Sequence, residues 1–497
     1  MEENNQALES EYKKKAISGT IWKFLERFIA QGVTLIVSLV IARILSPEDY
    51  SVVSLVTIFF LFANVIISGG LNTALIQKKN SDIEDYSSVL HVSLIISIAI
   101  YFILFLTAPF IAKAFNDSSI TLIIRIMGLS LPITAIKSIW CAYIYSNLLF
   151  KKFFFATLGG TLVSAFVGIY LALKGYGPWA LVAQQMTNTI IDTLILIFTA
   201  RLKIVFRINF KKFGVLFRYG WKIFLSNLIA TSYSEISPLI IGIKFSKVDL
   251  SFYTKGRSFP QLISQSTTTS LSSVLFPILS KVQYDKKKVL DYTRKYMQLA
   301  SYVVFPIMLG FFAVADNFVD SILTAKWAQT VYYIRLFCLV SMFDVVAVGN
   351  CETIKAIGRS GVYLVMEIIK KSLYLVTIFL FVFFADRPEV LAISAIVCTI
   401  IQITVNIIPN RKLIDYRYHL QAIDLLPNLF FAAIMCTAVY FIGYININSV
   451  FLLVIQIFAG IIIYIGLSLL FKNKSFIFIY SSSKSFISKM FQKRKSQ

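Results

Sequence analysis

The sequence predicts an all-α polytopic membrane protein with about fourteen transmembrane helices. Hydrophobic residues make up 57% of the 497 residues, and the mean hydropathy is +0.75. The apolar residues gather in runs of about 18–25, the length that a helix needs to cross about 30 Å of hydrocarbon. Because unpaired backbone groups are not tolerated in lipid, these runs must be helical. Basic residues collect in every second loop between the runs, as they do in multi-pass proteins.

The helices follow one another with short connections. In chain order we expect spans at 20–45, 50–70, 88–112, 120–145, 154–173, 178–200, 215–243, 249–277, 296–314, 329–350, 361–384, 389–409, 427–444 and 450–471. Long basic connections follow the sixth and the twelfth span. A repeat is also indicated by GTIWKF at 19–24 and YGWKIF at 219–224, and internal repeats are common in transporters. We therefore predict two six-helix lobes, an appended helix pair and a basic tail, with bounds 1–200, 201–410, 411–471 and 472–497.

The loop charges predict the orientation. The loops on the side of the N-terminus carry 31 Lys and Arg residues, whereas the opposite loops carry 6. This asymmetry places both termini in the cytoplasm. It also accounts for the net charge of +23 without nucleic acid as a partner. The first fifteen residues are polar, and the span after them lacks a small-residue cleavage site, so we expect no removable signal peptide.

Several classes of site are not indicated. The five cysteines are scattered, without CxxC spacing or histidine partners, so we expect no disulfide framework, no metal site and no cofactor. A membrane glycosyltransferase or polymerase would need a carboxylate or His/Arg cluster in a sizeable loop. Only His91 and His419 are present, and the longest outward loop, 315–328, has about 14 residues. We therefore predict no catalytic residues and no enzyme.

Three spans carry polar side chains at helical spacing. A charged side chain inside a span costs several kcal/mol, so it normally faces a cavity or a partner. Each stripe occupies one helix face, as the lining of an aqueous groove requires. Interhelical hydrogen bonds are the alternative explanation for the Ser, Thr and Gln residues. The stripes are Lys23, Arg27, Gln31, Thr34 and Ser38; Asn227, Thr231 and Glu235; and Arg257, Gln261, Gln265, Thr268 and Ser272.

The embedded cations favour an anionic substrate. The guanidinium fork of arginine pairs two phosphate oxygens at once, which suits a diphosphate headgroup that carries a sugar. The lipid tail of such a substrate would stay in the bilayer. Lys23 and Arg27 lie near the cytoplasmic end of their span, and snorkelling to the headgroups is the alternative for both. The predicted substrate-binding residues are Lys23, Arg27, Gln31, Arg125, Lys137, Arg257 and Gln261.

Acidic residues inside the spans are the candidates for ion coupling. Glu235 has no local basic partner and precedes Pro238 by three residues, and Asp192 continues a stripe with Gln184 and Asn188. We assign Glu235 and Asp192 to H⁺ or Na⁺ coupling. Glu367 instead has basic residues three and four positions later, so we expect an intrahelical ion pair there. Glu26 and Asp344 complete the embedded acidic set.

A series of segments resembles the polysaccharide (O-antigen-type) flippase family of the multidrug/oligosaccharidyl-lipid/polysaccharide exporter superfamily. The first span ends with Ala42, Arg43, Leu45, Pro47, Asp49 and Tyr50 in the family pattern. GGLNTALIQ (69–77), KGYGPWALVAQQ (174–185), FYTKGRSFPQL (252–262) and VLFPILSKVQ (274–283) follow in the family order. Ser51 and Ser251 depart from it, because the family usually has glycine there.

The resemblance implies a two-lobe transporter in the bacterial cytoplasmic (inner) membrane. Such proteins flip undecaprenyl-diphosphate-linked oligosaccharide repeat units to the outer leaflet by ion-coupled alternating access, and the implied partners are a polysaccharide polymerase and a chain-length regulator. A peptidoglycan-precursor flippase is a close alternative. A multidrug antiporter of the same superfamily should have an acidic, aromatic cavity, whereas the spans of this chain hold more Lys and Arg than Asp and Glu.

Overall fold

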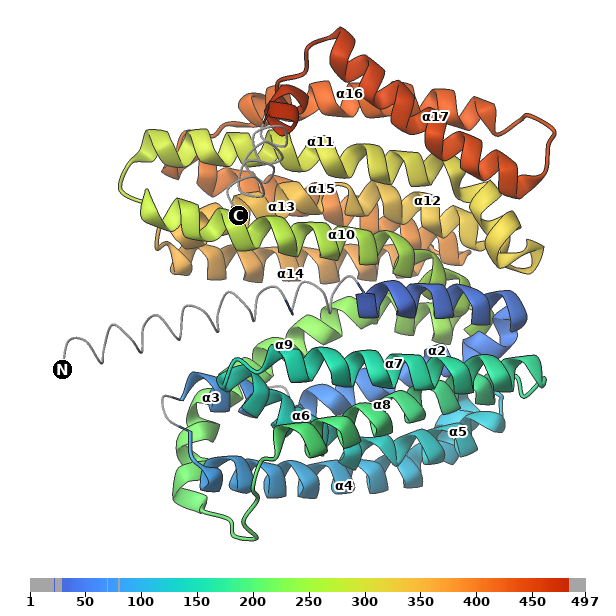
Figure 1. Ribbon diagram of the computed structural model, residues 1–497, viewed down its shortest axis with the longest axis vertical. Coiled ribbons are helices and arrows are strands. Elements are labelled where there is room, and N and C mark those ends of the chain that lie inside the picture. Colours follow the sequence, from blue (N-terminus) through green and yellow to red (C-terminus); the bar gives the residue numbers. More distant parts are fainter. Residues whose placement is uncertain (1–21, 23–28, 69, 79–80, 482–497) are drawn as a thin grey trace, which may run out of the picture. The chain divides into compact units, whose positions relative to one another are not determined.

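The computed structural model describes residues 22, 29–68, 70–78 and 81–481, and this part of the chain is built from helices (Figure 1). Ten of its helical segments are long and apolar enough to cross a membrane. The prediction of an all-α multi-pass membrane protein is therefore confirmed.

Four further predicted spans coincide with helices outside those ten. They are the short apolar helix Ile29–Ile44 and the helices α9 (Phe210–Lys244), α10 (Lys247–Lys281) and α14 (Ser360–Phe384). Helices α9 and α10 carry two of the three polar stripes, and Ile29–Ile44 carries Gln31, Thr34 and Ser38 of the third. Helix α14 holds Glu367, Lys370 and Lys371. The number of fourteen transmembrane helices stays a prediction.

Contacts divide the chain into two compact units, Met1–Ser251 and Phe252–Gln497. Within the described residues, unit 1 contains the helix Ile29–Ile44 followed by α2 (Pro47–Ser68), α3 (Leu71–Gln77), α4 (Ile83–Ala114), α5 (Ser119–Gly128), α6 (Ser130–Ser146), α7 (Phe150–Leu173), α8 (Pro178–Ala200) and α9 (Phe210–Lys244). Helix α10 (Lys247–Lys281) begins in unit 1 and continues into unit 2.

Unit 2 continues with α11 (Lys286–Phe318), the one-turn helices η1 (Val319–Leu323) and η2 (Ala325–Trp327), α12 (Thr330–Ser341), α13 (Asp344–Ala356), α14 (Ser360–Phe384), α15 (Pro388–Leu413), α16 (Tyr418–Ile442) and α17 (Ser449–Leu470). Helices α16 and α17 both pack along α11 (Figure 1). The division of the chain that treats this pair as appended stays a prediction.

The linker before α9 is fixed to unit 1. The Val205 N–H donates to Ser87 Oγ at 3.0 Å, and the Asn209 N–H donates to Ser88 Oγ at 2.9 Å, both on α4. Helix α9 then packs on α2, α3 and α4, so it belongs to unit 1 by its contacts. The lobe division at residues 200 and 201 stays a prediction.

Two predicted spans are interrupted in the structure. The span 120–145 separates into α5 and α6, and the span 329–350 into α12 and α13, whereas the span 50–70 coincides with α2 and is followed by α3. Pro132 gives a local reason for the break before α6, because its ring cannot donate a backbone hydrogen bond and clashes with the carbonyl four residues earlier. These breaks leave side chains such as Asp344 at helix termini.

The predicted start of the thirteenth span is corrected by the structure. We expected a loop over 410–426 and a helix from residue 427, but α16 begins at Tyr418 and continues through Pro427. Its first turns bury two polar residues, Gln421 and Asp424. Hydropathy alone marks such residues as loop, whereas here tertiary partners satisfy them.

Candidate functional site

Only some of the predicted site residues fall within the described part of the chain. Lys23 and Arg27 lie outside the described residues. Gln31 lies in the helix Ile29–Ile44, and Gln261 is half-buried in α10. Their roles stay predictions, and the geometry below concerns the remaining candidates.

The structure joins two residues that the sequence analysis assigned to different roles. Lys137 on α6 donates to the Asp192 carboxylate on α8, with 2.6 Å between Nζ and Oδ2. Asp192 is buried, and Lys137 is half-buried. Among the described residues, Asp192 Oδ1 has no hydrogen-bond partner. The carboxylate is therefore paired but only half satisfied.

The position of Asp192 depends on small residues of α7. A Cβ atom built on Gly160 would lie 1.7 Å from Asp192 Oδ1, so only glycine fits there. Asn188, one turn earlier on α8, donates to Ser164 Oγ at 3.4 Å. The stripe of Gln184, Asn188 and Asp192 thus faces α7. This contact lets a polar stripe lie at a helix–helix interface inside unit 1.

Two other candidates in unit 1 are placed separately. The guanidinium of Arg125 on α5 lies over the ring of Phe105 on α4, 4.2 Å from its centroid. Cation–π contacts of this kind stabilise a cation in an apolar environment. Glu235 on α9 accepts a hydrogen bond at 3.0 Å from Ser234, its neighbour in sequence. Within the described part of the chain, no hydrogen bond or ion pair joins either residue to Lys137 or Asp192.

Unit 2 places Arg257 in a second polar cluster. Ser264, seven residues later on α10, donates to Asp344 Oδ2 at 2.5 Å. Arg257 interacts electrostatically with the same carboxyl group. Asp344 is the first residue of α13, where the positive end of the helix dipole favours a carboxylate. The sequence showed Asp344 as an embedded acid but gave no signal that α10 would supply its partners.

The predicted intrahelical ion pair at Glu367 is confirmed. Lys370 Nζ lies 2.5 Å from Glu367 Oε1 on the next turn of α14. This pair neutralises charge within one helix, and it explains how α14 carries charged residues along an otherwise apolar sequence.

A larger polar cluster connects α11 with α16 and was not predicted. Arg294 holds the Asp424 carboxylate with two hydrogen bonds, at 2.8 Å from Nε and 2.9 Å from Nη2. Gln298 donates to Oδ1 at 2.6 Å, and Tyr416 donates to Oδ2 at 2.8 Å. The Asp424 carboxylate therefore receives four hydrogen bonds. This cluster fixes the start of α16 to the start of α11.

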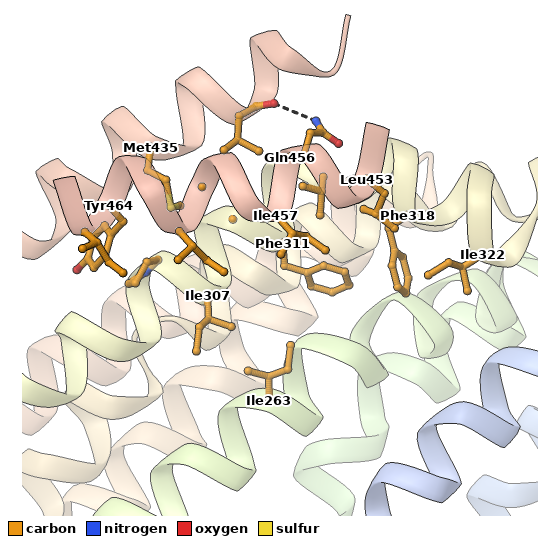
Figure 2. Close-up of a pocket in the computed structure, with 17 residues that line it drawn as sticks. Ile263, Ile307, Phe311, Phe318, Ile322, Met435, Leu453, Gln456, Ile457 and Tyr464 are labelled. Atoms are coloured by element: carbon orange, nitrogen blue, oxygen red, sulfur yellow. Dashed lines mark hydrogen bonds between the residues drawn. The ribbon is translucent and has the colours of Figure 1, made fainter. Parts of the chain in front are cut away.

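An apolar groove of about 580 Å³ lies in unit 2 along α11, α16 and α17 (Figure 2). Phe311 and Phe318 of α11, Met435 of α16, and Leu453 and Ile457 of α17 all line it. Ile263 of α10 lines it from another side. Ile307 and Ile461 belong to the lining and are also exposed, so the groove is open to the surface.

The polar atoms of Gln456 and Tyr464, two side chains that line the groove, are hydrogen-bonded to other protein groups. Gln456 donates to the Val439 carbonyl at 2.9 Å and accepts from Asn317 at 2.8 Å. The Tyr464 hydroxyl donates to the Tyr302 carbonyl at 3.0 Å. The groove therefore presents hydrocarbon and aromatic surface, which suits an apolar chain and not a sugar.

The fold is shared with solved multi-pass membrane transporters. The structure is similar to the lipid II flippase MurJ in an inward closed conformation, with a TM-score of 0.73 at 16% identity, over 92% of this chain and 98% of that one. It is also similar to an inward-facing multidrug resistance MATE family transporter, with a TM-score of 0.58 at 13% identity, over 80% of this chain and 98% of that one.

Sequence comparison gives the family. The chain belongs to the polysaccharide biosynthesis protein family, whose sequence profile matches residues 40–332. The succinoglycan biosynthesis transport protein ExoT of Rhizobium meliloti is 22% identical over 308 residues, which are 62% of this chain and 62% of ExoT. The aligned region thus spans less than two thirds of that relative. The family recognised from the sequence segments is confirmed.

Proposed function

We propose that this protein is a flippase that carries undecaprenyl-diphosphate-linked oligosaccharide repeat units from the cytoplasmic to the outer leaflet, for the biosynthesis of an O-antigen, a capsule or an exopolysaccharide. The observation that supports a substrate with a lipid tail is the open apolar groove on α11, α16 and α17. A hydrocarbon chain can lie in it while the diphosphate and sugars stay in a polar environment. Membership of the polysaccharide biosynthesis protein family supports a role in polysaccharide biosynthesis.

Charge balance supports a diphosphate headgroup over a cationic drug. The predicted spans contain more Lys and Arg than Asp and Glu, and Arg125 and Arg257 are both embedded. Arginine at such positions favours phosphate oxygens. A multidrug antiporter for organic cations would be disfavoured by the same charges.

The mechanism that we propose is alternating access coupled to H⁺ or Na⁺, with both termini in the cytoplasm. Asp192 is the stronger coupling candidate in the structure, because its carboxylate is buried and has one unsatisfied oxygen. A cation that binds there competes with Lys137 for the same carboxylate. Glu235 stays a second candidate. Interaction with a polymerase or a chain-length regulator also stays a proposal.

The test is transport in proteoliposomes with the lipid-diphosphate oligosaccharide carrying a fluorescent sugar, in which a membrane-impermeant quencher reports the leaflet. Ile461→Trp fills the groove, whereas Ile462→Trp adds the same bulk at an exposed position of α17 outside its lining. We expect Ile461→Trp to slow transport about tenfold, the scale of one pocket contact, and Ile462→Trp to leave it near wild type.

Three substrates separate the alternatives in the same assay. Faster transport of a peptidoglycan precursor than of the oligosaccharide lipid would favour the peptidoglycan-precursor flippase. Export of an organic cation without lipid movement would favour the antiporter. Equal transport rates for Ile461→Trp and Ile462→Trp would show that the groove takes no part in transport.

A further inference from the structure

A second hollow, of about 400 Å³, lies in unit 2 and differs from the groove in chemistry. It is formed by the first turns of α11 and by the helical residues 474–481 that follow α17. Arg294, Lys295 and Lys474 line it together with one acidic residue, Asp291, and with Gln298 and Phe478. Leu299 and Ser475 complete the lining, and we call the hollow formed by these eight residues the headgroup pocket.

The cations of the headgroup pocket are held in place by neighbours. Arg294 and Lys295 share one face of α11 with Gln298, at spacings of three and four residues. Asp424 accepts two of the five N–H donors of Arg294, and its four hydrogen bonds leave it little further capacity as a partner. The Lys295 ammonium lies 3.8 Å from the centroid of the Phe478 ring.

The headgroup pocket is located at the end of an apolar span. Helix α17 has the sequence SVFLLVIQIFAGIIIYIGLSLL and ends at Leu470, only four residues before Lys474. Ile477 and Tyr480, on the helical residues after it, are exposed. Exposed aromatic and apolar residues beside lysines are typical of the level of the lipid headgroups. Seven basic residues occur from Lys472 to the end of the chain, and such clusters attract anionic lipid.

From these observations we infer that the headgroup pocket binds the phosphate of an anionic glycerophospholipid from the adjacent leaflet. Three basic side chains from two elements converge on a hollow that has one acidic side chain in its lining. Their N–H groups are the donors that phosphate oxygens accept in charge-assisted hydrogen bonds. Phe478 and Leu299 supply apolar surface for the part of the lipid's acyl chains that is next to the glycerol. This inference does not depend on the proposed transport activity.

The experiment uses the purified full chain in detergent, titrated with phosphatidylglycerol or with zwitterionic phosphatidylcholine, and native mass spectrometry counts the retained lipid. Lys295→Gln with Lys474→Gln removes two charges from the pocket. Lys286→Gln with Lys287→Gln removes two charges from the same end of α11, at exposed positions outside the lining. Lys295→Arg with Lys474→Arg keeps the charge and controls for altered folding.

We expect wild type to retain phosphatidylglycerol at least tenfold better than phosphatidylcholine. A basic residue near an anionic headgroup contributes about fivefold, so the pocket double variant should lose most of this preference. The Lys286/Lys287 control and the arginine variant should keep it. Absence of a preference in wild type, or an equal loss in the Lys286/Lys287 control, would overturn the inference. Displacement of the lipid by millimolar glycerol 3-phosphate would also overturn it, since the site would then bind a soluble phosphate.

Discussion

Unit 1 and unit 2 each bury an aspartate against a basic side chain, but the two carboxylates have different surroundings. The Asp192 side chain is 4% exposed and the Asp424 side chain 1%, while their partners Lys137 and Arg294 are 26% and 33% exposed. Asp424 accepts four hydrogen bonds, which use both of its oxygens. Asp192 accepts one from Lys137, and its Oδ1 has no partner among the described residues.

Under the coupling mechanism that we propose, this difference separates a structural role of Asp424 from a functional role of Asp192. A fully satisfied buried network rigidifies the elements that it connects, and Asp424 connects α16 to α11. A buried polar atom without a partner costs free energy, and a native protein that retains one needs a reason. The proposed exchange of one cation for another at Asp192 during transport would supply such a reason.

The largest effect is expected at Asp424. Replacement with alanine leaves Arg294, Gln298 and Tyr416 without their shared acceptor, and breaking a buried ion pair costs about 3–5 kcal/mol. We expect Asp424→Ala to lower the thermal unfolding midpoint strongly in detergent. Asp415→Ala, which removes an exposed ion pair with Arg417 nearby, should change it little. Equal midpoints for the two variants would show that the Asp424 cluster does not stabilise unit 2.

The next effect concerns the space beside Asp192. Gly160→Ala introduces a Cβ that meets the carboxylate, and overpacking of this kind costs about 1–3 kcal/mol. Gly159→Ala is the matched control, because its Cβ meets only the terminal methyl of Ile195, which can move. We expect a lower unfolding midpoint for Gly160→Ala alone. A stable Gly160→Ala protein with normal transport would mean that α7 does not position Asp192.

Asp192→Asn tests the functional side of the comparison. Asparagine keeps the shape of the side chain but removes the charge that pairs with Lys137, so we expect a stability loss of about 1.5–3 kcal/mol, the range for a hydrogen bond to a charged group. Transport driven by an ion gradient should fall about tenfold, within the usual range of coupling free energies. Asp320→Asn, at an exposed carboxylate, serves as control. Normal ion-driven transport in Asp192→Asn would assign the coupling elsewhere.

The smallest effect is expected at a half-buried pair, Asp117 and Lys247, which are joined by a hydrogen bond. Partial burial raises the pKa of Asp117, but hydrogen bonds from Lys247 and Ser119 outweigh it, and the net pKa lies below the usual value. The resulting stabilisation is present above the pKa of the unfolded chain and is lost as the pH falls through the lowered pKa. Asp117→Asn should therefore lower stability by under about 1 kcal/mol at pH 7.

The pH dependence is the check on this last prediction. Thermal midpoints of wild type and Asp117→Asn should differ at pH 7 and converge as the pH falls below about 4, the usual range for an aspartate. A difference that persists at low pH would indicate lost packing and not lost charge.

The sequence alone determined the multi-pass helical architecture, because the length and polarity of an apolar run are properties of the run itself. Over its described residues, each predicted span falls on one helix or on two consecutive helices, and the Glu367–Lys370 pair followed from spacing within one helix. The family also followed from short segments read in order.

Only the tertiary structure decided which polar residues meet. Lys137 and Asp192 are 55 residues apart, and Arg294 and Asp424 are 130 apart, so no local pattern predicts either pair. The helical start of α16 was missed for the same reason, since Gln421 and Asp424 have polar side chains whose burial depends on partners from α11 and α13. Whether a charge inside a membrane protein is paired, satisfied or open to a ligand depends on helix packing, and helix packing is a property of the whole fold.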